Sequence, residues 1–336
     1  MRPLLLLPLI LCLIPLHLFA EDTPTHLLRN SPRILFLGDS ITADGRYVAW
    51  FETWLVAQKI TPPQVVINAG LSSETVSGLS EDGHAGGKFP RPDLAERLDR
   101  ILKLARPNLV IACYGMNCGI YQPFAPERFE KYKAGIQHLK SKVEHAGAKI
   151  ILVTPPVYDD GVIPPGGYSY NEVLDRYADW LLAQRAQGWH VVDLHHPMTA
   201  ELHARRKQDP KFQFQPDRVH PNDAGLWFIA QQLIRYFGDE PSARTSSPQE
   251  MLKQLHLPQE LLPLVTQRSK ILHDAYLSTA GHSRPGVAKG LPLSRKRKQK
   301  PPNCHRNPAS CGRQTINCGC PGQLGWRSHK SLNVDG

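Results

Sequence analysis

The sequence predicts an α/β protein, a three-layer sandwich in which helices cover both faces of a five-stranded parallel sheet. The first observation is a series of short apolar runs, each ending in a small or polar residue. Such runs are typical of strands in parallel sheets, because helices bury both faces of the sheet. The second observation is that amphipathic stretches with helical spacing alternate with these runs five times. Right-handed crossovers between successive strands then make all the strands parallel.

The first predicted strand covers residues 34–37 and ends in the turn Gly38-Asp39-Ser40. Glycine permits a tight turn at this point. From about Asp44 to Lys59, apolar residues recur at helical spacing, and Thr61-Pro62-Pro63 stops the pattern. Ser40 therefore falls at the carboxyl end of a strand and near a helix start, at the edge where open α/β sheets bind ligands.

The remaining elements follow the same two patterns along the chain. Four further apolar runs with small or polar ends are predicted as strands, over residues 65–70, 109–115, 150–154 and 190–194. Five stretches with apolar residues at helical spacing are predicted as helices, over residues 92–105, 126–145, 171–187, 222–237 and 248–280. Residues 71–90 are rich in glycine, serine and charge, and are predicted to form a loop.

The first twenty residues are typical of a secretory signal peptide. One arginine precedes a leucine-rich run that ends at Ala20, just before the acidic pair Glu21-Asp22. A membrane anchor is the alternative, because the run approaches the length that spans a bilayer. Two prolines in the run and the small residue Ala20 favour cleavage, and hence export to the periplasm or the cell exterior. Lipidation at Cys12 is disfavoured, because Leu11 is too large for the position before a lipidated cysteine.

The formal net charge of the 336-residue chain is +10, and it is concentrated at the C-terminus. Residues 283–336 contain eleven lysines and arginines and one acid, so residues 1–282 sum to zero. The zero net charge of residues 1–282, the body of the protein, argues against a nucleic-acid-binding domain in this part of the chain. The tail is predicted to be disordered. The partner of its basic run over residues 295–300 could be a sulfated or acidic polysaccharide, a membrane surface, or nothing. The abrupt change in composition also fits a translation out of frame beyond about Ser294.

Residues at the strand ends offer the parts of a site with a serine nucleophile. Such a serine needs a base to take its proton and donors for the oxyanion. Ser40 lies near a helix N-terminus, which favours developing negative charge. Gly70 ends the second strand, so its backbone N–H is expected to be free to point into the cleft. Asn117 follows the third strand and offers a side-chain amide as a second donor.

A base for Ser40 is available in the segment Asp217-Arg218-Val219-His220-Pro221. A carboxylate three residues before a histidine can hold Nδ1 of the imidazole and leave Nε2 toward the serine. Taken singly, each residue has a plainer interpretation, since Asn117 suits a turn and His220 suits a loop. The combination is stronger, because each residue ends a predicted strand or opens a helix on the same edge of the sheet.

Four segments together resemble the SGNH/GDSL hydrolase superfamily, in particular its secreted bacterial GDSL-type esterases. These blocks appear in the family's order and at its typical separations: Gly38-Asp39-Ser40-Ile41, Asn68-Ala69-Gly70, Gly115-Met116-Asn117 and Asp217-Arg218-Val219-His220-Pro221. The resemblance covers roughly residues 30–240, with a helical extension over 248–282 and the tail beyond it. It implies a flavodoxin-like α/β/α sandwich that hydrolyses esters without a metal or cofactor.

By this resemblance, Ser40 is the nucleophile, and Asp217 and His220 complete a catalytic triad. The backbone N–H groups of Ser40 and Gly70 and the side-chain amide of Asn117 form the oxyanion hole. The third block usually reads Gly-x-Asn-Asp, and here Cys118 replaces the aspartate. That aspartate supports its loop, so the replacement is expected to reduce the precision with which Asn117 is placed and not to remove the mechanism.

The other body cysteine is Cys113, and two cysteines do not make a disulfide scaffold. Whether Cys113 pairs with Cys118 stays open at this stage, because it depends on geometry.

Two further groups of polar residues have competing interpretations. The loop after residue 71 looks like the one that shapes the substrate cleft in secreted bacterial members of the family. Its Glu74 and His84 could contact a polar substrate, although a solvated loop is the favoured interpretation. Asp193, His195 and His196 cluster at the end of the fifth strand. Structural hydrogen bonding is expected there, because a metal site would need a further ligand with suitable geometry.

The sequence therefore predicts an exported serine esterase that removes short acyl groups, acetyl above all, from carbohydrates. The polar loop favours a small acyl group on a polar carrier over a long lipid. A lipase or lysophospholipase of the same fold is the alternative enzyme, and a non-catalytic carbohydrate- or polyanion-binding protein is the alternative class. The expected partner is a small-molecule or glycan ester, with no nucleic acid and no stable membrane span after signal cleavage.

Overall fold

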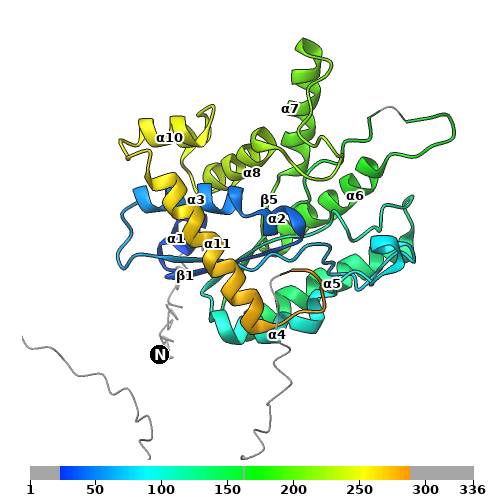
Figure 1. Cartoon of the computed structure of the whole chain (residues 1–336), viewed down its shortest axis with the longest axis horizontal. Coiled ribbons are helices and arrows are strands. Elements are labelled where there is room, and N and C mark those ends of the chain that lie inside the picture. Colours follow the sequence, from blue (N-terminus) through cyan, green and yellow to red (C-terminus); the bar gives the residue numbers. More distant parts are fainter. Residues whose placement is uncertain (1–22, 162, 288–336) are drawn as a thin grey trace, which may run out of the picture. The chain divides into compact units, whose positions relative to one another are not determined.

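A computed structural model describes residues 23–161 and 163–287 of the chain (Figure 1). Its sheet has five strands, namely β1 (Arg33–Gly38), β2 (Val65–Asn68), β3 (Leu109–Cys113), β4 (Lys149–Val153) and β5 (His190–Val192). All neighbouring pairs are parallel, and the spatial order is β2-β1-β3-β4-β5. This is the order of the flavodoxin-like fold, whose ligand crevice lies where the chain direction across the sheet reverses, between β1 and β3. The predicted fold class is confirmed.

Helices flank this sheet. In chain order they are α1 (Pro24–Arg29), α2 (Ser40–Asp44), α3 (Arg46–Ala57), the 3₁₀ helix η1 (His84–Gly87), α4 (Leu94–Ala105), α5 (Pro126–His145), α6 (Tyr170–Ala183), the 3₁₀ helix η2 (Gln184–Gln187), α7 (His195–Gln208), α8 (Asp223–Tyr236), α9 (Glu240–Ala243), α10 (Pro248–Gln254) and α11 (Leu261–Ala280). Helix α3 packs beside α8 and α11, and α4 packs beside α5. The strands are buried between these helices, so their apolar runs form the centre of the core.

Two differences from the predicted elements affect the site. The first predicted helix begins earlier, at Ser40 itself, and is divided into α2 and α3 by Gly45, whose φ of 85° no β-branched residue would adopt readily. Helix α7 was not predicted, because its sequence is polar and buries only His195, Met198 and Leu202. The segment that follows β5 is therefore helical, and the loop that carries His220 begins only after residue 208.

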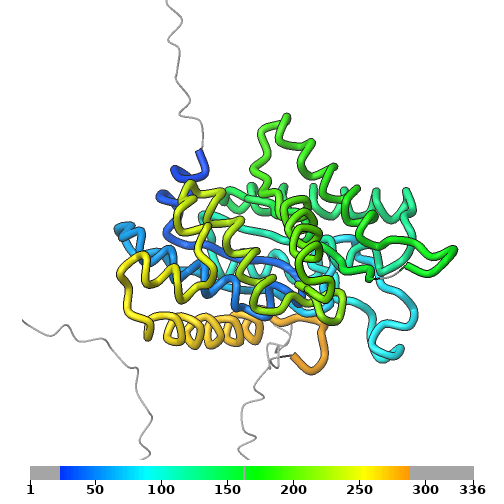
Figure 2. The backbone as a smooth tube through the Cα atoms, turned by 90° about the horizontal axis from the view of Figure 1, so that it is seen from above, coloured from blue at the N-terminus to red at the C-terminus, as the bar shows by residue number. Residues whose placement is uncertain are grey.

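The C-terminal helices belong to the main core. Met251 and Leu252 of α10 are fully buried, and α11 buries Leu262, Val265 and Leu277. Helix α11 packs against α3, β2 and α4. Figure 1 shows it beside α3 and α4, and Figure 2 shows the same helix from above, in orange. The helical extension expected after residue 248 is therefore not an appendage, because it covers the outer strand β2.

Several expectations fall on residues that the structure does not describe. They are the signal peptide over residues 1–20 and the basic tail from residue 288 onward. Within the described part of the chain, none of the helices combines the length and apolar character that crossing a bilayer requires.

Candidate active site

Ser40 is the first residue of α2, directly after the turn that ends β1. The Asp39 side chain caps this helix, because its Oδ1 accepts a hydrogen bond from the Ile41 N–H at 3.0 Å. The turn is tight enough that a Cβ on Gly38 would lie 2.1 Å from Thr42 Oγ1, so only glycine fits there. The Ser40 N–H belongs to the first turn of a helix, where the backbone offers no intrahelical acceptor. Ser40 itself is partly exposed.

The sequence-predicted triad residues lie in one hydrogen-bonded chain. His220 Nε2 is 2.8 Å from Ser40 Oγ, and His220 Nδ1 is 2.7 Å from Asp217 Oδ2. The other carboxylate oxygen of Asp217 accepts the backbone N–H groups of Val219 at 3.0 Å and His220 at 2.7 Å. This local loop fixes the carboxylate against the imidazole. The His220 and Asp217 side chains are 53% and 57% exposed, so this part of the site faces solvent.

The hydrogen bonds to Asp217 also fix its charge. Partial burial acts to raise the pKa of Asp217, but hydrogen bonds from the backbone and ring of His220 and from Val219 outweigh it and lower the pKa below its ordinary value. Asp217 is therefore a carboxylate near neutral pH. Behind the serine, burial raises the pKa of Asp39 to about 6, with the Ile41 N–H and the nearby His220 partly offsetting this effect.

Gly70 packs directly against the helix that carries Ser40. A Cβ on Gly70 would lie 2.5 Å from the Ala43 backbone nitrogen, so the close approach of α2 requires glycine here. The Gly70 N–H donates to Asn68 Oδ1 at 2.9 Å, and Asn68 Nδ2 donates to the Thr42 carbonyl at 2.7 Å. The expectation that the Gly70 N–H has no partner is therefore wrong. The Asn68 side chain folds back on its own backbone, as asparagine often does in turns, and joins the end of β2 to α2.

Asn117 is buried, and its side-chain amide is held at both ends. Its Nδ2 donates to the Glu74 carbonyl at 3.3 Å, and its Oδ1 accepts the hydroxyl of Tyr121 at 2.8 Å. An amide nitrogen carries two N–H groups, so one of them is left over from this arrangement. Tyr121 was not singled out in the sequence, because only the fold turns its hydroxyl toward Asn117.

Cys118 occupies a closed site beside Asn117. Its side chain is fully buried, and the backbone of Val76 and Ser77 hydrogen-bonds to its sulfur. Burial raises the pKa of the Cys118 thiol to about 12, with these bonds acting in the opposite direction. Its carbonyl also accepts the Ser77 hydroxyl at 3.2 Å. Cys113 and Cys118 are both buried free thiols.

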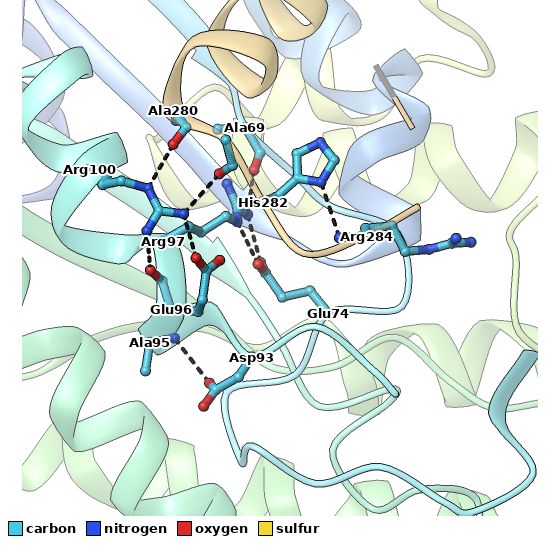
Figure 3. A network of polar contacts seen from close by, with 12 residues as sticks. Ala69, Glu74, Asp93, Ala95, Glu96, Arg97, Arg100, Ala280, His282 and Arg284 are labelled. Atoms are coloured by element: carbon cyan, nitrogen blue, oxygen red, sulfur yellow. Dashed lines mark hydrogen bonds and ion pairs between the residues drawn. The ribbon is translucent and has the colours of Figure 1, made fainter. Parts of the chain in front are cut away.

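Glu74 is fully buried, so it neither contacts a substrate nor lies in a solvated loop, and both interpretations considered for this residue are wrong. Its carboxylate receives the Arg97 guanidinium at 2.5 and 2.6 Å (Figure 3). It also accepts the Tyr114 hydroxyl at 2.6 Å. Burial raises the pKa of Glu74, and its three donors partly compensate. The neighbouring Glu74 carboxylate in turn raises the pKa of Arg97 against the effect of burial. The first turn of the predicted loop is thus an ordered part of the core.

The same ion pair supports both proposed donor segments. Arg97 Nη2 donates to the Ala69 carbonyl at 2.8 Å, which belongs to the same peptide group as the Gly70 N–H (Figure 3). The Glu74 carbonyl holds Asn117, as described above. Arg97 lies on the apolar face of α4, between Leu94 and Ile101. A charged residue on that face is the signal in the sequence that could have revealed this buried pair.

His84 lies in η1, where its contacts are with its own loop. Its Nδ1 is 3.4 Å from Glu81 Oε1, and its ring packs edge-on against Phe89. Arg91 binds the same Glu81 through two nitrogens and stacks over the Tyr121 ring at 5.2 Å. The loop is therefore anchored beside Asn117 by Arg91. A substrate contact of His84 stays a prediction.

The cluster after β5 is a set of hydrogen bonds and ion pairs. The His196 ring lies 3.1 Å from Asp193 and 3.2 Å from Asp179. His195 is fully buried, with Nδ1 at 3.2 Å from the Pro155 carbonyl and Nε2 at 3.1 Å from Asp175. Burial lowers the pKa of His195. Over residues 23–161 and 163–287, three or more potential ligands are nowhere grouped so as to hold a metal ion.

Comparison with known sequences gives one family. Residues 36–227 match the profile of the GDSL-like Lipase/Acylhydrolase family, which is more than half of the chain. A search of curated protein sequences found no significant match.

Comparison with one solved structure supports the fold. A gut microbial diltiazem-metabolizing enzyme is 22% identical with a TM-score of 0.51, over 62% of this chain and 47% of that one. This chain therefore matches about half the length of that enzyme. The acetylxylan esterase Axe2 of Geobacillus stearothermophilus is 24% identical with a TM-score of 0.47, over 61% of this chain and 93% of that one. The acetyl xylan esterase AlAXEase is 20% identical with a TM-score of 0.48, over 60% and 98% of the respective chains.

Proposed function

Because the chain belongs to the GDSL-like lipase/acylhydrolase family and is a carboxylic ester hydrolase, we propose that Ser40, His220 and Asp217 are its catalytic triad. The observation that carries this proposal is the hydrogen-bonded chain in which His220 Nε2 is 2.8 Å from Ser40 Oγ and its Nδ1 is 2.7 Å from Asp217. These are the distances that proton transfer from a serine to a histidine requires.

The reaction follows from the roles of these groups. Ser40 Oγ attacks the ester carbonyl while His220 Nε2 takes its proton, and Asp217 stabilises the imidazolium that forms. His220 then gives the proton to the leaving alcohol, and an acyl group remains on Ser40. Water enters, His220 takes one of its protons, and the resulting hydroxyl attacks the acyl carbon. Collapse of the second tetrahedral intermediate releases the acid and restores Ser40.

The oxyanion of both intermediates needs donors, for which we propose the Ser40 N–H, the Gly70 N–H and the Asn117 amide. The first belongs to the opening turn of α2, and Asn117 has one N–H beyond its bond to Glu74. The Gly70 N–H has to be shared with Asn68 Oδ1 or released by it, because this bond exists in the resting enzyme. Loss of one such donor costs about 3–4 kcal/mol of transition-state stabilisation.

The substrate that we propose is a short acyl ester, acetyl above all, on a carbohydrate. Two observations support it: the His220 and Asp217 side chains are more than half exposed, and the neighbouring loop is polar. A bulky polar carrier can stay in solvent while its small acyl group reaches Ser40. A lipase would instead bury a long acyl chain in an apolar cavity.

The test is hydrolysis of p-nitrophenyl acetate, butyrate and decanoate by the wild type, by Ser40→Ala and by Ser247→Ala. Ser247 caps α10 and serves as a control for loss of a serine. We expect acetate to be preferred, Ser40→Ala to lose at least about a thousandfold in kcat, and Ser247→Ala to keep it. Turnover that survives in a folded Ser40→Ala protein would rule out the triad. A preference for decanoate would favour the lipase alternative. Binding of glycans without turnover would favour a non-catalytic carbohydrate-binding protein.

We also propose that the protein is exported and that cleavage follows Ala20. The support is the pattern of the first twenty residues. N-terminal sequencing of the protein from the periplasm or medium is expected to begin at Glu21. An uncleaved chain recovered only with membranes would instead favour the anchor.

A further inference from the structure

Helix α11 contacts the proposed oxyanion hole from outside the segment that matches the family. The family match ends at residue 227, whereas α11 covers Leu261–Ala280. His273 of this helix has its Nε2 at 3.0 Å from the Gly70 carbonyl oxygen, and only 12% of its side chain is exposed. A carbonyl oxygen only accepts hydrogen bonds, so His273 Nε2 carries the proton and donates it.

This bond completes the set that fixes the two peptide groups of Gly70. In the preceding peptide group, the Ala69 carbonyl accepts from Arg97 and the Gly70 N–H donates to Asn68. In the following peptide group, the Gly70 carbonyl accepts from His273, and the Leu71 N–H donates to the Gly38 carbonyl at 2.8 Å. Glycine has the widest choice of backbone angles of any residue, so the direction of its N–H depends on bonds of this kind.

We infer that His273 is a positioning residue of the oxyanion hole and that α11 thereby takes part in the active site. The inference rests on the role proposed for Gly70. Without the His273 donor, the peptide group after Gly70 is held by the Leu71 bond alone, so the backbone of this glycine, which joins the two peptide groups, is fixed less firmly. The Gly70 N–H then spends less time in the direction that stabilises the oxyanion, which slows the chemical step and leaves the binding of the ester almost unchanged.

Other contacts hold α11 in place and allow a matched control. The Tyr276 hydroxyl accepts a hydrogen bond from Arg33 Nη2 at 3.1 Å, and Arg268 forms an ion pair with Glu52 of α3. Both contacts anchor the helix without touching Gly70. Tyr276→Phe therefore weakens the docking of α11 one turn away from His273 and leaves the Gly70 carbonyl with its donor.

The experiment compares His273→Met, His273→Gln and Tyr276→Phe in the full chain. Methionine and glutamine have similar length and volume, but only glutamine offers an N–H donor. With p-nitrophenyl acetate, we expect His273→Met to lower kcat at least about tenfold with KM within about twofold, and His273→Gln to recover most of kcat. A trifluoromethyl ketone, which forms an oxyanion on Ser40, should bind His273→Met more weakly by the same factor as the loss in kcat/KM. Tyr276→Phe should lower Tm and keep kcat.

Two results would overturn the inference. One is a folded His273→Met protein with wild-type kcat and wild-type affinity for the ketone. The other is an equal loss of kcat in Tyr276→Phe and His273→Met at equal Tm, because this would indicate a general effect of α11 docking. His273→Leu is a second donor-free variant, in case His273→Met does not fold.

A readout without turnover separates this inference from the proposed function. If the wild type fails to hydrolyse esters, the triad proposal fails, while amide hydrogen exchange at Gly70 and Leu71 still tests His273. Exchange at these amides should be faster in His273→Met than in the wild type, and unchanged in Tyr276→Phe. Unchanged exchange in His273→Met would contradict the positioning role, whatever the activity.

Discussion

Glu74 illustrates how a polar residue in a polar loop can belong to the core. Its carboxylate is fully buried, and the guanidinium of Arg97 is its ionic partner. Replacing one member of a buried ion pair leaves the other charge without compensation, which costs far more than the loss of a surface pair. The pair is therefore a requirement of the fold as well as a support of the site.

We accordingly predict that Glu74→Gln lowers the free energy of unfolding by about 3–5 kcal/mol. The partly exposed Glu201, which pairs with the exposed Arg205 on the surface of α7, offers a control, and Glu201→Gln should cost about 1 kcal/mol or less. Urea denaturation of both variants measures the difference. Equal losses of unfolding free energy in the two variants would show that burial does not increase the contribution of the Glu74–Arg97 pair to stability.

The two body cysteines lead to a second prediction about single residues. Burial raises the pKa of Cys118 to about 12 and that of Cys113 well above its ordinary value, so neither provides the thiolate that reacts with alkylating reagents. Iodoacetamide at pH 8 should leave both unmodified in the folded protein and modify both after unfolding in urea. Peptide mapping by mass spectrometry separates them from the cysteines of the tail. Rapid alkylation of either one in the folded state would contradict the burial.

At the scale of elements, the contact between α3 and α11 includes a buried carboxylate. Burial raises the pKa of Glu52 to about 7, and the charge of Arg268 offsets this effect only in part. The folded state thus holds a proton on Glu52 more tightly than the unfolded state. Its contribution to stability is complete below pH about 4.5 and is lost as the pH rises to about 7.

We predict that the free energy of unfolding falls between pH 4.5 and pH 8 because of Glu52. Glu52 alone should make the wild type about 3 kcal/mol less stable at the higher pH, and Glu52→Gln should remove this contribution. In Glu240→Gln the loss of stability between pH 4.5 and pH 8 should persist. Hydrogen bonds from Arg235 and Arg244 lower the pKa of Glu240, so this residue does not contribute to that loss. Urea titrations at both pH values give the difference. Identical pH dependence in wild type and Glu52→Gln would refute the assignment.

Individual elements also show what the sequence can and cannot predict. The helix over residues 126–145 was predicted to the residue and the strands to within two residues at each end, because burial on one face or on both faces leaves a recognisable pattern. Helix α7 was missed, because a helix that buries only three side chains leaves almost no pattern. Motifs singled out Ser40, Asn117, Asp217 and His220 as candidate site residues. The bonds of Arg97 to Ala69 and of His273 to Gly70 were not predicted, because they join segments distant in sequence through side-chain directions that only the packed structure defines.

At the scale of the whole molecule, the hydrophobic core includes the C-terminal helices. Met251, Leu252, Leu262, Val265 and Leu277 are buried, and each such side chain contributes about 1.5–3 kcal/mol on burial. Together they match the total stability of about 5–15 kcal/mol that a domain usually has. The segment that matches the family is therefore not expected to fold without them.

We predict that a chain ending at residue 247 does not unfold cooperatively, whereas one ending at residue 287 keeps the wild-type Tm and esterase activity. The second chain retains every residue of the proposed site. Thermal unfolding followed by circular dichroism distinguishes the two. The second chain should also lose salt-dependent retention on a sulfated polysaccharide column, because almost all of the net charge of +10 lies beyond residue 287. A stable, active chain ending at residue 247 would show that α10 and α11 are dispensable.

The exposure of the His220 and Asp217 side chains, each more than half, has a further consequence. If the substrate is a polymeric carbohydrate ester, as we propose, it can reach Ser40 from the solvent side, where His220 and Asp217 lie, without threading an end through a tunnel. Acyl groups in the middle of a long chain are then as accessible as those at its ends. Deacylation would then occur at random positions along the polymer, which would lose its acyl groups while keeping its length.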